Sequence, residues 1–321
     1  MNTIHHWTTA NIPDQTGRIA VITGANSGLG YQTALALASK NAHVVMACRN
    51  LAKANAARDK ILQQTPEASL TVMALDLADL ASIRAFAAAF LTRYDRLDLL
   101  INNAGIMIPP LRHTADGFEL QFGTNHLGHF ALTSLLLERL MEQPNSRIVT
   151  VSSIVAHIGR IKFDDLMHQR RYNRWLAYGQ SKLANLLFAS ELQRRLVAAK
   201  ATPISLAAHP GGSTTNLQHA GIGIDNAFSQ KLLMLLVSPF LQSAAMGALP
   251  QLYAATAPGV QGGDYLGPGD WLGITGYPAK ARLPWAARDQ TAANRLWHES
   301  ERLTGVSYDA LIPQAEPATT P

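Results

Sequence analysis

The chain contains a single cysteine, Cys48, among its 321 residues. One thiol cannot supply a disulfide framework or a cysteine-based zinc site, so a disulfide-stapled secreted scaffold is excluded. The eleven histidines show no His-x-x-x-His spacing, and we read His126 and His129 as ordinary helix residues. We therefore expect no metal site and a reducing, cytoplasmic location.

Charged residues are scarce and nearly balanced. Lys, Arg, Asp and Glu make up 15% of the chain, and 27 basic against 22 acidic side chains leave a formal charge of +5. No basic run is interleaved with aromatic residues, so nucleic-acid binding is not expected, whereas a mild positive excess suits an anionic cofactor. With 47% hydrophobic residues, the chain is apolar enough for a well-buried globular protein.

Long hydrophobic runs are also missing. The most apolar stretch, Leu232–Leu241, is too short to span a bilayer and is interrupted by Pro239. Met1–Gln15 lacks the apolar region and cleavage site of an export signal. We predict no transmembrane segment, and two interpretations of residues 232–241 stay open: a buried or substrate-covering helix, or a contact with a membrane surface.

Glycines cluster directly after the first apolar run. Residues 18–23 are rich in β-branched side chains and predict a buried parallel strand, and an alanine-rich helix follows to about Ser39. Between them lies the spacing Gly-x-x-x-Gly-x-Gly. Strand, glycine turn and helix together predict a dinucleotide site, because glycines let the backbone approach the pyrophosphate and the helix offers free N–H groups. The predicted contacts are Gly24, Asn26, Ser27, Gly28, Leu29 and Gly30.

The second predicted strand, residues 43–47, ends without an acidic residue. No Asp or Glu occurs between Gly30 and Asp59, so the carboxylate that would bind the ribose 2′-hydroxyl of NAD is missing. Arg49 and Asn50 stand there instead, and a guanidinium pairs well with a 2′-phosphate. We therefore predict NADP in preference to NAD; the alternative is a surface arginine at a strand end.

Strands and helices alternate along the rest of the chain. This alternation predicts an α/β fold, a Rossmann-like doubly wound parallel sheet with helices on both faces. The further expected strands are residues 70–75, 97–101, 147–151, 203–208 and a short one within 262–267. The further expected helices are residues 51–65, 80–94, 175–199 and 285–303.

No linker or internal repeat divides the chain, so we expect one domain over residues 1–321. Its expected parts are a cofactor-binding and catalytic core, a helical substrate-covering insertion, and a last strand with a C-terminal helix and tail. These parts are residues 16–215, 216–262 and 263–321.

Small and polar residues follow two of the expected strands at their carboxyl ends, where open α/β sheets bind ligands. Asp76 and Leu77 follow the third strand, and Asp76 either accepts a hydrogen bond from an adenine amine or caps the next helix. Asn103, Ala104 and Gly105 follow the fourth strand and suit close backbone packing beside a bound nucleotide.

Tyr178 and Lys182 are four residues apart in the expected helix 175–199, which puts them on one face, one turn apart. An ammonium group favours the phenolate, so we expect the pKa of Tyr178 to fall from ~10 toward neutrality. Such a phenol can exchange a proton with an alcohol or carbonyl oxygen. Taken alone, the pair also fits a solvated helix face; the surrounding motifs favour catalysis.

Together these motifs resemble the short-chain dehydrogenase/reductase family. The matching residues are Thr23-Gly24-x-x-x-Gly28-x-Gly30, Asn102-Asn103-Ala104-Gly105, Asn125, Ser153, Tyr178-x-x-x-Lys182 and Pro210-Gly211. The amino-acid sequence of residues 125–130, 152–157 and 178–185 resembles the retinol-dehydrogenase-like branch of this family more closely.

The resemblance implies roles for these residues. Tyr178 would be the catalytic acid/base, and Lys182 would lower its pKa and bind the nicotinamide ribose. Ser153 would hydrogen-bond the substrate oxygen, and Asn125 would anchor a water that relays protons. The nicotinamide carboxamide would be held by Pro210, Gly211 and Thr215.

The predicted function is NADP-dependent interconversion of a lipophilic aldehyde or ketone and the corresponding alcohol by hydride transfer. A small-molecule substrate is the expected partner, and homo-oligomer formation stays open. One alternative is a catalytically silent dinucleotide-binding or scaffold protein, which the presence of Tyr178, Lys182 and Ser153 disfavours. Another is a polyketide- or protochlorophyllide-type reductase; Cys48 lies at the adenosine end, away from where the light-driven type would need it.

Overall fold

The computed structural model describes residues 6–212, 242–270 and 272–312. In this part of the chain the strands are β1 (Ile19–Thr23), β2 (His43–Cys48), β3 (Ser69–Ala74), β4 (Leu99–Asn102), β5 (Arg147–Val151), β6 (Ile204–Ala208), β7 (Tyr265–Pro268) and β8 (Pro278–Lys280). The α-helices are α1 (Gly28–Ala38), α2 (Leu51–Gln64), α3 (Leu80–Arg93), α4 (Leu120–Phe122), α5 (Gly128–Met141), α6 (Arg174–Ala198), α9 (Ala244–Thr256) and α10 (Gln290–Thr304).

The described strands form one eight-stranded sheet in the order β3-β2-β1-β4-β5-β6-β7-β8. Neighbouring strands from β3 to β7 pair in parallel, and β8 pairs antiparallel with β7. The strand order reverses between β1 and β4, and ligands of open α/β sheets bind at such a reversal, beyond the carboxyl ends of the strands. The predicted single-domain, Rossmann-like α/β fold is confirmed.

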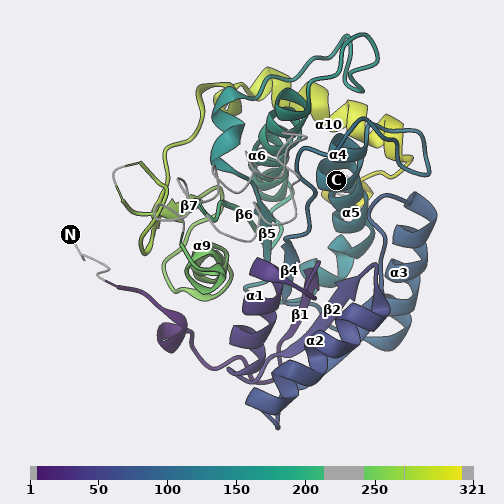
Figure 1. The fold of residues 1–321 in the computed structure, drawn as a ribbon. Coiled ribbons are helices and arrows are strands. Elements are labelled where there is room, and N and C mark those ends of the chain that lie inside the picture. Colours follow the sequence, from purple (N-terminus) through teal and green to yellow (C-terminus); the bar gives the residue numbers. More distant parts are fainter. Residues whose placement is uncertain (1–5, 213–241, 271, 313–321) are drawn as a thin grey trace, which may run out of the picture.

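Each face of the sheet is covered by its own set of helices (Figure 1). Successive side chains of a strand point to opposite faces, so Ile22 belongs to the core cluster that also contains residues of α1, α2 and α9. Val21 belongs to the cluster on the other face, which contains residues of α3, α5, α6 and α10. Both faces are therefore apolar along β1. This explains why its sequence is a continuous hydrophobic run and not an alternating one.

The bounds of α4 and α5 were not among the expected helices, although His126 and His129 were read as helix residues. Of the other features not predicted from the sequence, three bear on the fold. The strand β8 is one of them. The second is a π-helical turn at Gly123–Leu127, which leads directly into α5. The third is a break in the expected helix 285–303: a 3-10 turn at Trp285–Arg288 precedes α10, and Asp289 between them caps α10 by accepting from the backbone N of Ala292 at 2.9 Å.

The expected substrate-covering segment, residues 216–262, falls partly outside the described residues. Its described part contains α9, which packs against α1 in the core of the first face. The apolar stretch 232–241 lies wholly outside the described residues, so both interpretations of it stay predictions. Within the described ranges, none of the helices has the length and apolar character needed to cross a membrane.

The C-terminal helix α10 is anchored by Trp297, whose side chain is 2% exposed. Its ring centroid lies 4.3 Å from that of Tyr308 and 5.2 Å from that of Phe130, and the Arg195 guanidinium lies 4.4 Å from it. This aromatic cluster joins α10 to α5 and α6, the helix that carries Tyr178.

We expect Trp297→Ala to lower the free energy of unfolding by ~3–5 kcal/mol, because it removes a buried indole and leaves a cavity. Trp285 is 85% exposed, and Trp285→Ala is the matched control that should change stability little. Urea unfolding followed by circular dichroism measures both. Similar losses in the two variants would contradict the anchoring role of Trp297.

Candidate active site

The glycine turn is packed against the loop that follows β4. Gly24 and Gly28 have positive φ angles of 67° and 54°, which favour glycine. At Gly30 a Cβ atom would overlap the carbonyl oxygen of Gly24 and the side chain of Asn103. The turn therefore lies flat against its neighbours, as close backbone approach to a pyrophosphate requires.

The other predicted contacts of the turn differ in what they offer. Ser27 is exposed at the N-cap of α1 and makes no side-chain capping bond, so its hydroxyl is open to a ligand. Asn26 is half-buried beside it. Leu29 belongs to the core of the first face, so a nucleotide contact there would come from its backbone. Their roles as cofactor contacts remain predictions.

The hydroxyl of Thr23, at the end of β1, joins the turn to the loop after β4. Thr23 Oγ1 accepts from the backbone N of Asn103 and of Ala104, each at 2.9 Å. In return, Asn103 Nδ2 donates to the Thr23 carbonyl oxygen at 2.8 Å. The loop and the turn are thus held together as one unit.

His129 connects this unit to Asn125. Its Nε2 lies 2.9 Å from Thr23 Oγ1 and its Nδ1 lies 3.0 Å from the Asn125 carbonyl oxygen. Because Thr23 Oγ1 already accepts two bonds, it donates its proton to Nε2, and Nδ1–H donates to Asn125. Burial lowers the pKa of His129 to about 4, which keeps the ring neutral as this arrangement needs.

Asn125 lies in the π-helical turn, and its side chain joins the loop after β4 to α6. Its Nδ2 donates to the Ile106 carbonyl at 2.9 Å and to Ser181 Oγ at 3.0 Å, and its Oδ1 accepts from the Ile106 N at 2.8 Å. For a water, Asn125 offers two acceptors: its backbone carbonyl oxygen, beside the bond from His129, and the second lone pair of Oδ1. The relay role remains a prediction.

Tyr178, Lys182 and Ser153 come together at the carboxyl end of β5. Tyr178 is 3% exposed and lies beside Ser153, while Lys182 Nζ lies 5.8 Å from the phenol ring centre. A Cβ atom at Gly105 would lie 3.2 Å from Lys182 Nζ and 3.3 Å from Asn125 Oδ1. The predicted catalytic residues thus lie close together beside the loop after β4.

The neighbouring residues Ser152 and Ser153 have different hydrogen-bond partners in the structure. Ser152 Oγ donates to the Lys182 carbonyl at 2.8 Å, which ties α6 to the end of β5. Ser153 Oγ accepts from the Val155 N at 3.2 Å and faces Tyr178. Ser152 is therefore structural, and Ser153 is the hydroxyl available to a substrate.

The expected fall in the pKa of Tyr178 is wrong for this structure. Burial raises the pKa of Tyr178 to about 12, against a smaller opposing effect of the Ser153 hydrogen bond. Burial also lowers the pKa of Lys182 to about 8. On raising the pH the ammonium therefore loses its charge before the phenol ionises, so Lys182 does not bring the pKa of Tyr178 down in this structure.

Arg49 and Asp76 lie at the adjacent ends of β2 and β3. Arg49 Nη1 is 4.0 Å from Asp76 Oδ2, and the Arg49 side chain is 72% exposed. An exposed pair at this distance contributes little, so the guanidinium remains available to an anion. Its pairing with a 2′-phosphate remains a prediction.

The alternative role of Asp76 as a helix cap is wrong. Asp79 caps α3 by accepting from the Ala81 N at 2.9 Å, because it directly precedes the helix. Asp76 instead accepts from the Ala78 N at 3.0 Å, and its adenine contact stays a prediction.

Two further predicted cofactor contacts already have structural roles. Asn50 caps α2, so its side-chain oxygen already accepts a hydrogen bond from the Lys53 N. Leu77 is buried in the core of the second face.

The loop after β6 brings Pro210 and Gly211 to the same edge of the sheet. Gly211 has a φ of 64°, and a Cβ there would overlap the Ile274 carbonyl oxygen. Gln242 Nε2 donates to the Pro210 carbonyl at 2.7 Å. Thr215 lies outside the described residues, so the predicted carboxamide contact is only partly in view.

Two residues important for this geometry were missed from the sequence. His129 was read as an ordinary helix residue, and Gln251 was not singled out. Gln251 Nε2 donates to Thr33 Oγ1 and, at 3.2 Å, to Asn103 Oδ1, and so holds the loop after β4 against α9 and α1. A lone glutamine in an apolar helix was the available signal, since a buried amide needs partners.

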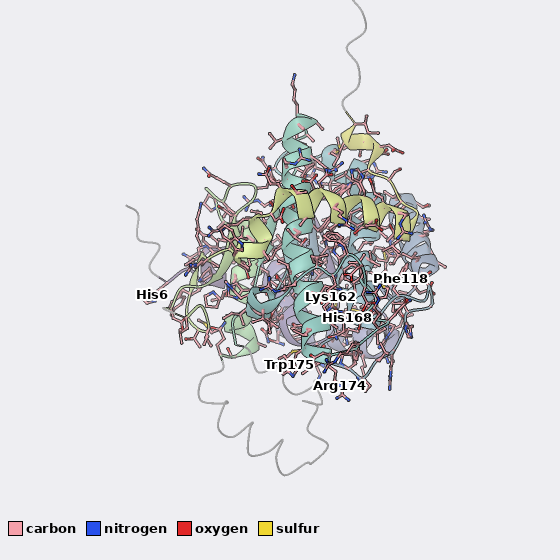
Figure 2. The ribbon with its side chains drawn as sticks, turned by 90° about the horizontal axis from the view of Figure 1, so that it is seen from above. His6, Phe118, Lys162, His168, Arg174 and Trp175 are labelled. Carbon is pink, nitrogen blue, oxygen red and sulfur yellow. The ribbon has the colours of Figure 1, made fainter. Side chains whose placement is uncertain are left out.

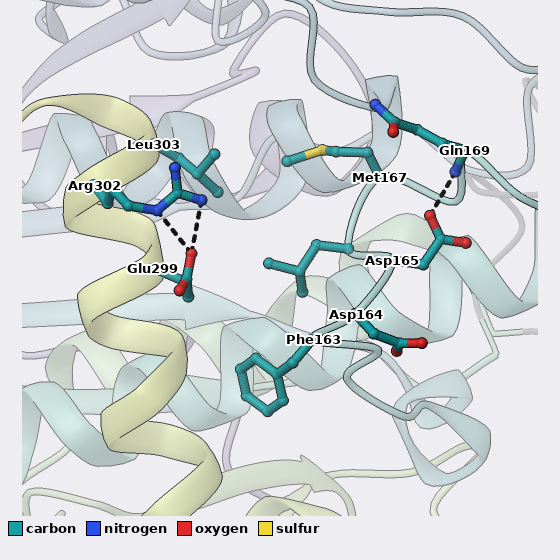
Figure 3. Close-up of a pocket in the computed structure, with 9 residues that line it drawn as sticks. Phe163, Asp164, Asp165, Met167, Gln169, Glu299, Arg302 and Leu303 are labelled. Atoms are coloured by element: carbon teal, nitrogen blue, oxygen red, sulfur yellow. Dashed lines mark hydrogen bonds and ion pairs between the residues drawn. The ribbon is translucent and has the colours of Figure 1, made fainter.

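A separate hollow lies on the surface between residues 163–169 and α10 (Figure 3). On its α10 side Arg302 donates to Glu299 at 2.8 Å. None of the predicted site residues lines it. In the parts of the chain described above, no three His, Cys, Asp or Glu side chains gather in a way that could hold a metal ion.

Comparisons with known proteins agree with these motifs. The family model for short chain dehydrogenases matches residues 18–221. Retinol dehydrogenase 12 of Mus musculus is 42% identical over 297 residues, which cover 91% of this chain and 88% of that protein. Retinol dehydrogenase 13 of Homo sapiens is 42% identical over 312 residues, covering 96% and 90%.

Solved structures share the fold. An uncharacterized protein from Mycobacterium paratuberculosis is 44% identical and superposes with a TM-score of 0.78, covering 94% of this chain and 98% of its own. The RhlG/NADP active-site complex of Pseudomonas aeruginosa is 22% identical with a TM-score of 0.60, covering 78% and 94%. At that identity the likeness concerns the fold alone.

The low pKa of Lys182 predicts a pH-dependent stability. Burial lowers this pKa from 10.5 to about 8, so the unfolded chain binds the proton more tightly than the folded chain. Burying the charged lysine lowers the free energy of unfolding, and this cost has its full size below the folded-state pKa. It disappears as the pH rises from the folded-state pKa toward the unfolded-state pKa.

We expect the free energy of unfolding of the wild type to rise relative to that of Lys182→Met between about pH 7 and about pH 9.5. Chemical denaturation of both proteins at the two pH values measures the difference, and the variant cancels the titration of other groups. An identical pH dependence would show that the lysine is not desolvated in the fold.

Proposed function

The chain belongs to the short-chain dehydrogenase family, in its retinol-dehydrogenase-like branch, and we propose that it interconverts a lipophilic aldehyde or ketone and the corresponding alcohol with NADP(H). Family membership makes it an NAD(P)-dependent oxidoreductase acting on CH–OH groups. The observation that carries the finer proposal is the convergence of Tyr178, Ser153 and Lys182 in one buried site.

In the direction of reduction, Tyr178 acts as the proton donor. Its pKa of about 12 keeps the phenol protonated near neutral pH, and an acid in that state can protonate the oxygen of a carbonyl. Ser153 hydrogen-bonds the same oxygen and stabilises the negative charge that develops on it. A nicotinamide cofactor held at this edge of the sheet would supply the hydride for the carbonyl carbon.

Lys182 assists after the proton has moved. Neutral pH lies below the pKa of Lys182, which is about 8, so the lysine keeps its positive charge there. That charge stabilises the phenolate that Tyr178 becomes when it has donated its proton. A proton then returns to Tyr178 by way of Lys182 and a water at the carbonyl oxygen of Asn125. The same ammonium is suited to the hydroxyls of the nicotinamide ribose.

The preference for NADP rests on charge at the end of β2. Arg49 is exposed there, and no carboxylate stands in the position that would bind a ribose 2′-hydroxyl. A guanidinium can form two charge-assisted bonds with a phosphate. Asp76 is near enough to orient Arg49 without neutralising it in a buried pair.

The lipophilic substrate class is supported by the surroundings of Tyr178. Ile108 is buried against it, and Met107 and Val155 pack on the same cluster. An apolar wall at the phenol suits a carbonyl attached to a hydrocarbon body. The relatives described above are named retinol dehydrogenases, and retinol is a long apolar alcohol, so their names agree with this class.

The central test is turnover. We expect the wild type to consume NADPH when medium-chain aldehydes are added, followed by the loss of nicotinamide absorbance. Tyr178→Phe should abolish turnover and leave NADPH binding unchanged, because only the transferable proton is lost. A wild type that binds NADPH and turns over no carbonyl would favour the catalytically silent dinucleotide-binding protein instead.

A second test concerns the cofactor. Arg49→Glu should weaken NADPH binding roughly 100-fold more than NADH binding, because it replaces a phosphate-pairing cation by an anion. Lys60→Glu on the exposed side of α2 changes the net charge equally and is the matched control. Isothermal titration measures the Kd of the wild type and of both variants for NADPH and for NADH. An unchanged preference for NADPH over NADH in Arg49→Glu would rule out the phosphate contact.

A further inference from the structure

Ile108 forms part of the site under unusual backbone constraint. It is 1% exposed, packs directly on Tyr178, and has a φ of 48°. A β-branched residue very rarely adopts this left-handed conformation, because its side chain crowds the backbone. Such strained residues cluster at functional sites and persist only where their surroundings hold them in place. The loop therefore needs a clamp.

Gln121 of α4 supplies that clamp. Its side chain is fully buried, and Oε1 accepts from the Ile108 N at 2.7 Å. Its Nε2 donates to Tyr172 Oη and to the Arg174 carbonyl oxygen, both at 3.1 Å. One amide thus ties the loop after β4 to the first residue of α6, one turn before Tyr178. Figure 2 labels Arg174 and Trp175 at this end of the helix.

The clamp is itself held on two sides. Tyr172 Oη donates to the Pro109 carbonyl at 3.0 Å, so the strained loop is bound at two successive residues. The buried carboxylate of Glu119 accepts from the Gln121 N at 3.0 Å and from the Phe122 N at 2.7 Å, which fixes the start of α4. The amide of Gln121 therefore has one orientation available.

We propose that Gln121 is a positioning residue for the reaction: it holds Ile108 against Tyr178 and fixes the loop after β4 relative to the start of α6. The inference rests on the proposed function of Tyr178. Gln121 touches neither the phenol nor the expected nucleotide turn, so its effect falls on the carbonyl side of the site. Its loss lets Ile108 relax away from the strained conformation and widens the wall at the phenol.

Gln180 is a matched control in the same part of the molecule. It is also fully buried, its Oε1 accepts from the Lys162 N at 3.0 Å, and its Nε2 donates to the Leu166 carbonyl at 2.8 Å. It therefore joins the segment before α6 to that helix as Gln121 does, with none of its hydrogen bonds reaching Ile108. A general loosening of this segment would affect both variants alike.

The experiment compares Gln121→Met with Gln180→Met in aldehyde reduction. We expect Gln121→Met to lower kcat/KM about 10-fold, chiefly through kcat, because the carbonyl is no longer held at the phenol in a reactive geometry. The Kd for NADPH should stay within about twofold of the wild type, and Gln180→Met should stay within about threefold in kcat/KM.

Equal losses in Gln121→Met and Gln180→Met, or an equal loss in NADPH affinity, would overturn the proposal. Should Gln121→Met fail to fold, Tyr172→Phe carries the comparison against Gln180→Met, because it removes the hydroxyl that accepts from Gln121 and donates to the Pro109 carbonyl. Hydrogen exchange of the Ile108 amide, read by mass spectrometry, tests the clamp without turnover. Unchanged exchange in the Gln121 variant overturns the inference; faster exchange in a chain whose wild type reduces no carbonyl counts against the proposed function alone.

Discussion

The site depends on the hydroxyl of one buried threonine. Thr23 Oγ1 accepts hydrogen bonds from the backbone N–H groups of Asn103 and Ala104, and it donates a hydrogen bond to Nε2 of His129. These bonds fix the distance between the glycine turn and the loop after β4, where the nucleotide and the catalytic lysine are expected to meet. A Cβ at Gly30 is intolerable for the same reason, since the side chain of Asn103 is held against that position. The cost of leaving such buried groups unpaired keeps the arrangement in place.

Desolvation, and not the attraction between neighbouring charges, sets the protonation states of the site. The phenol and the ammonium are both almost completely buried, and burial moves the pKa of Tyr178 up to about 12 and that of Lys182 down to about 8. His129 is neutral for the same reason. Near neutral pH the site therefore holds a protonated phenol and a charged lysine, which is the starting state that the proposed carbonyl reduction needs. In the proposed reverse reaction, a phenol that the fold keeps protonated would have to ionise.

Much of the fold was predictable from the sequence because its signals are local. The apolar strands such as residues 147–151 and the glycine turn carry their patterns in a few consecutive residues, and the structure has them where they were expected. The hydrogen bonds that complete the site are not local: Thr23 and His129 are 106 residues apart, and Gln251 and Thr33 are 218 apart. No spacing rule reveals such partners. The pKa of Tyr178 was misjudged because a four-residue spacing places a charge nearby but says nothing of burial.

Among the described residues the sheet ends at β8, a strand of three residues that begins with Pro278 and runs antiparallel to its neighbour β7. Proline has no N–H group to offer a further strand, and so short an edge gives an incoming chain little backbone to pair with. This border therefore resists the edge-to-edge joining of sheets that leads proteins into fibrils. An otherwise parallel sheet, which folds slowly and exposes apolar strands while it does so, gains protection at that border from a feature unrelated to its chemistry.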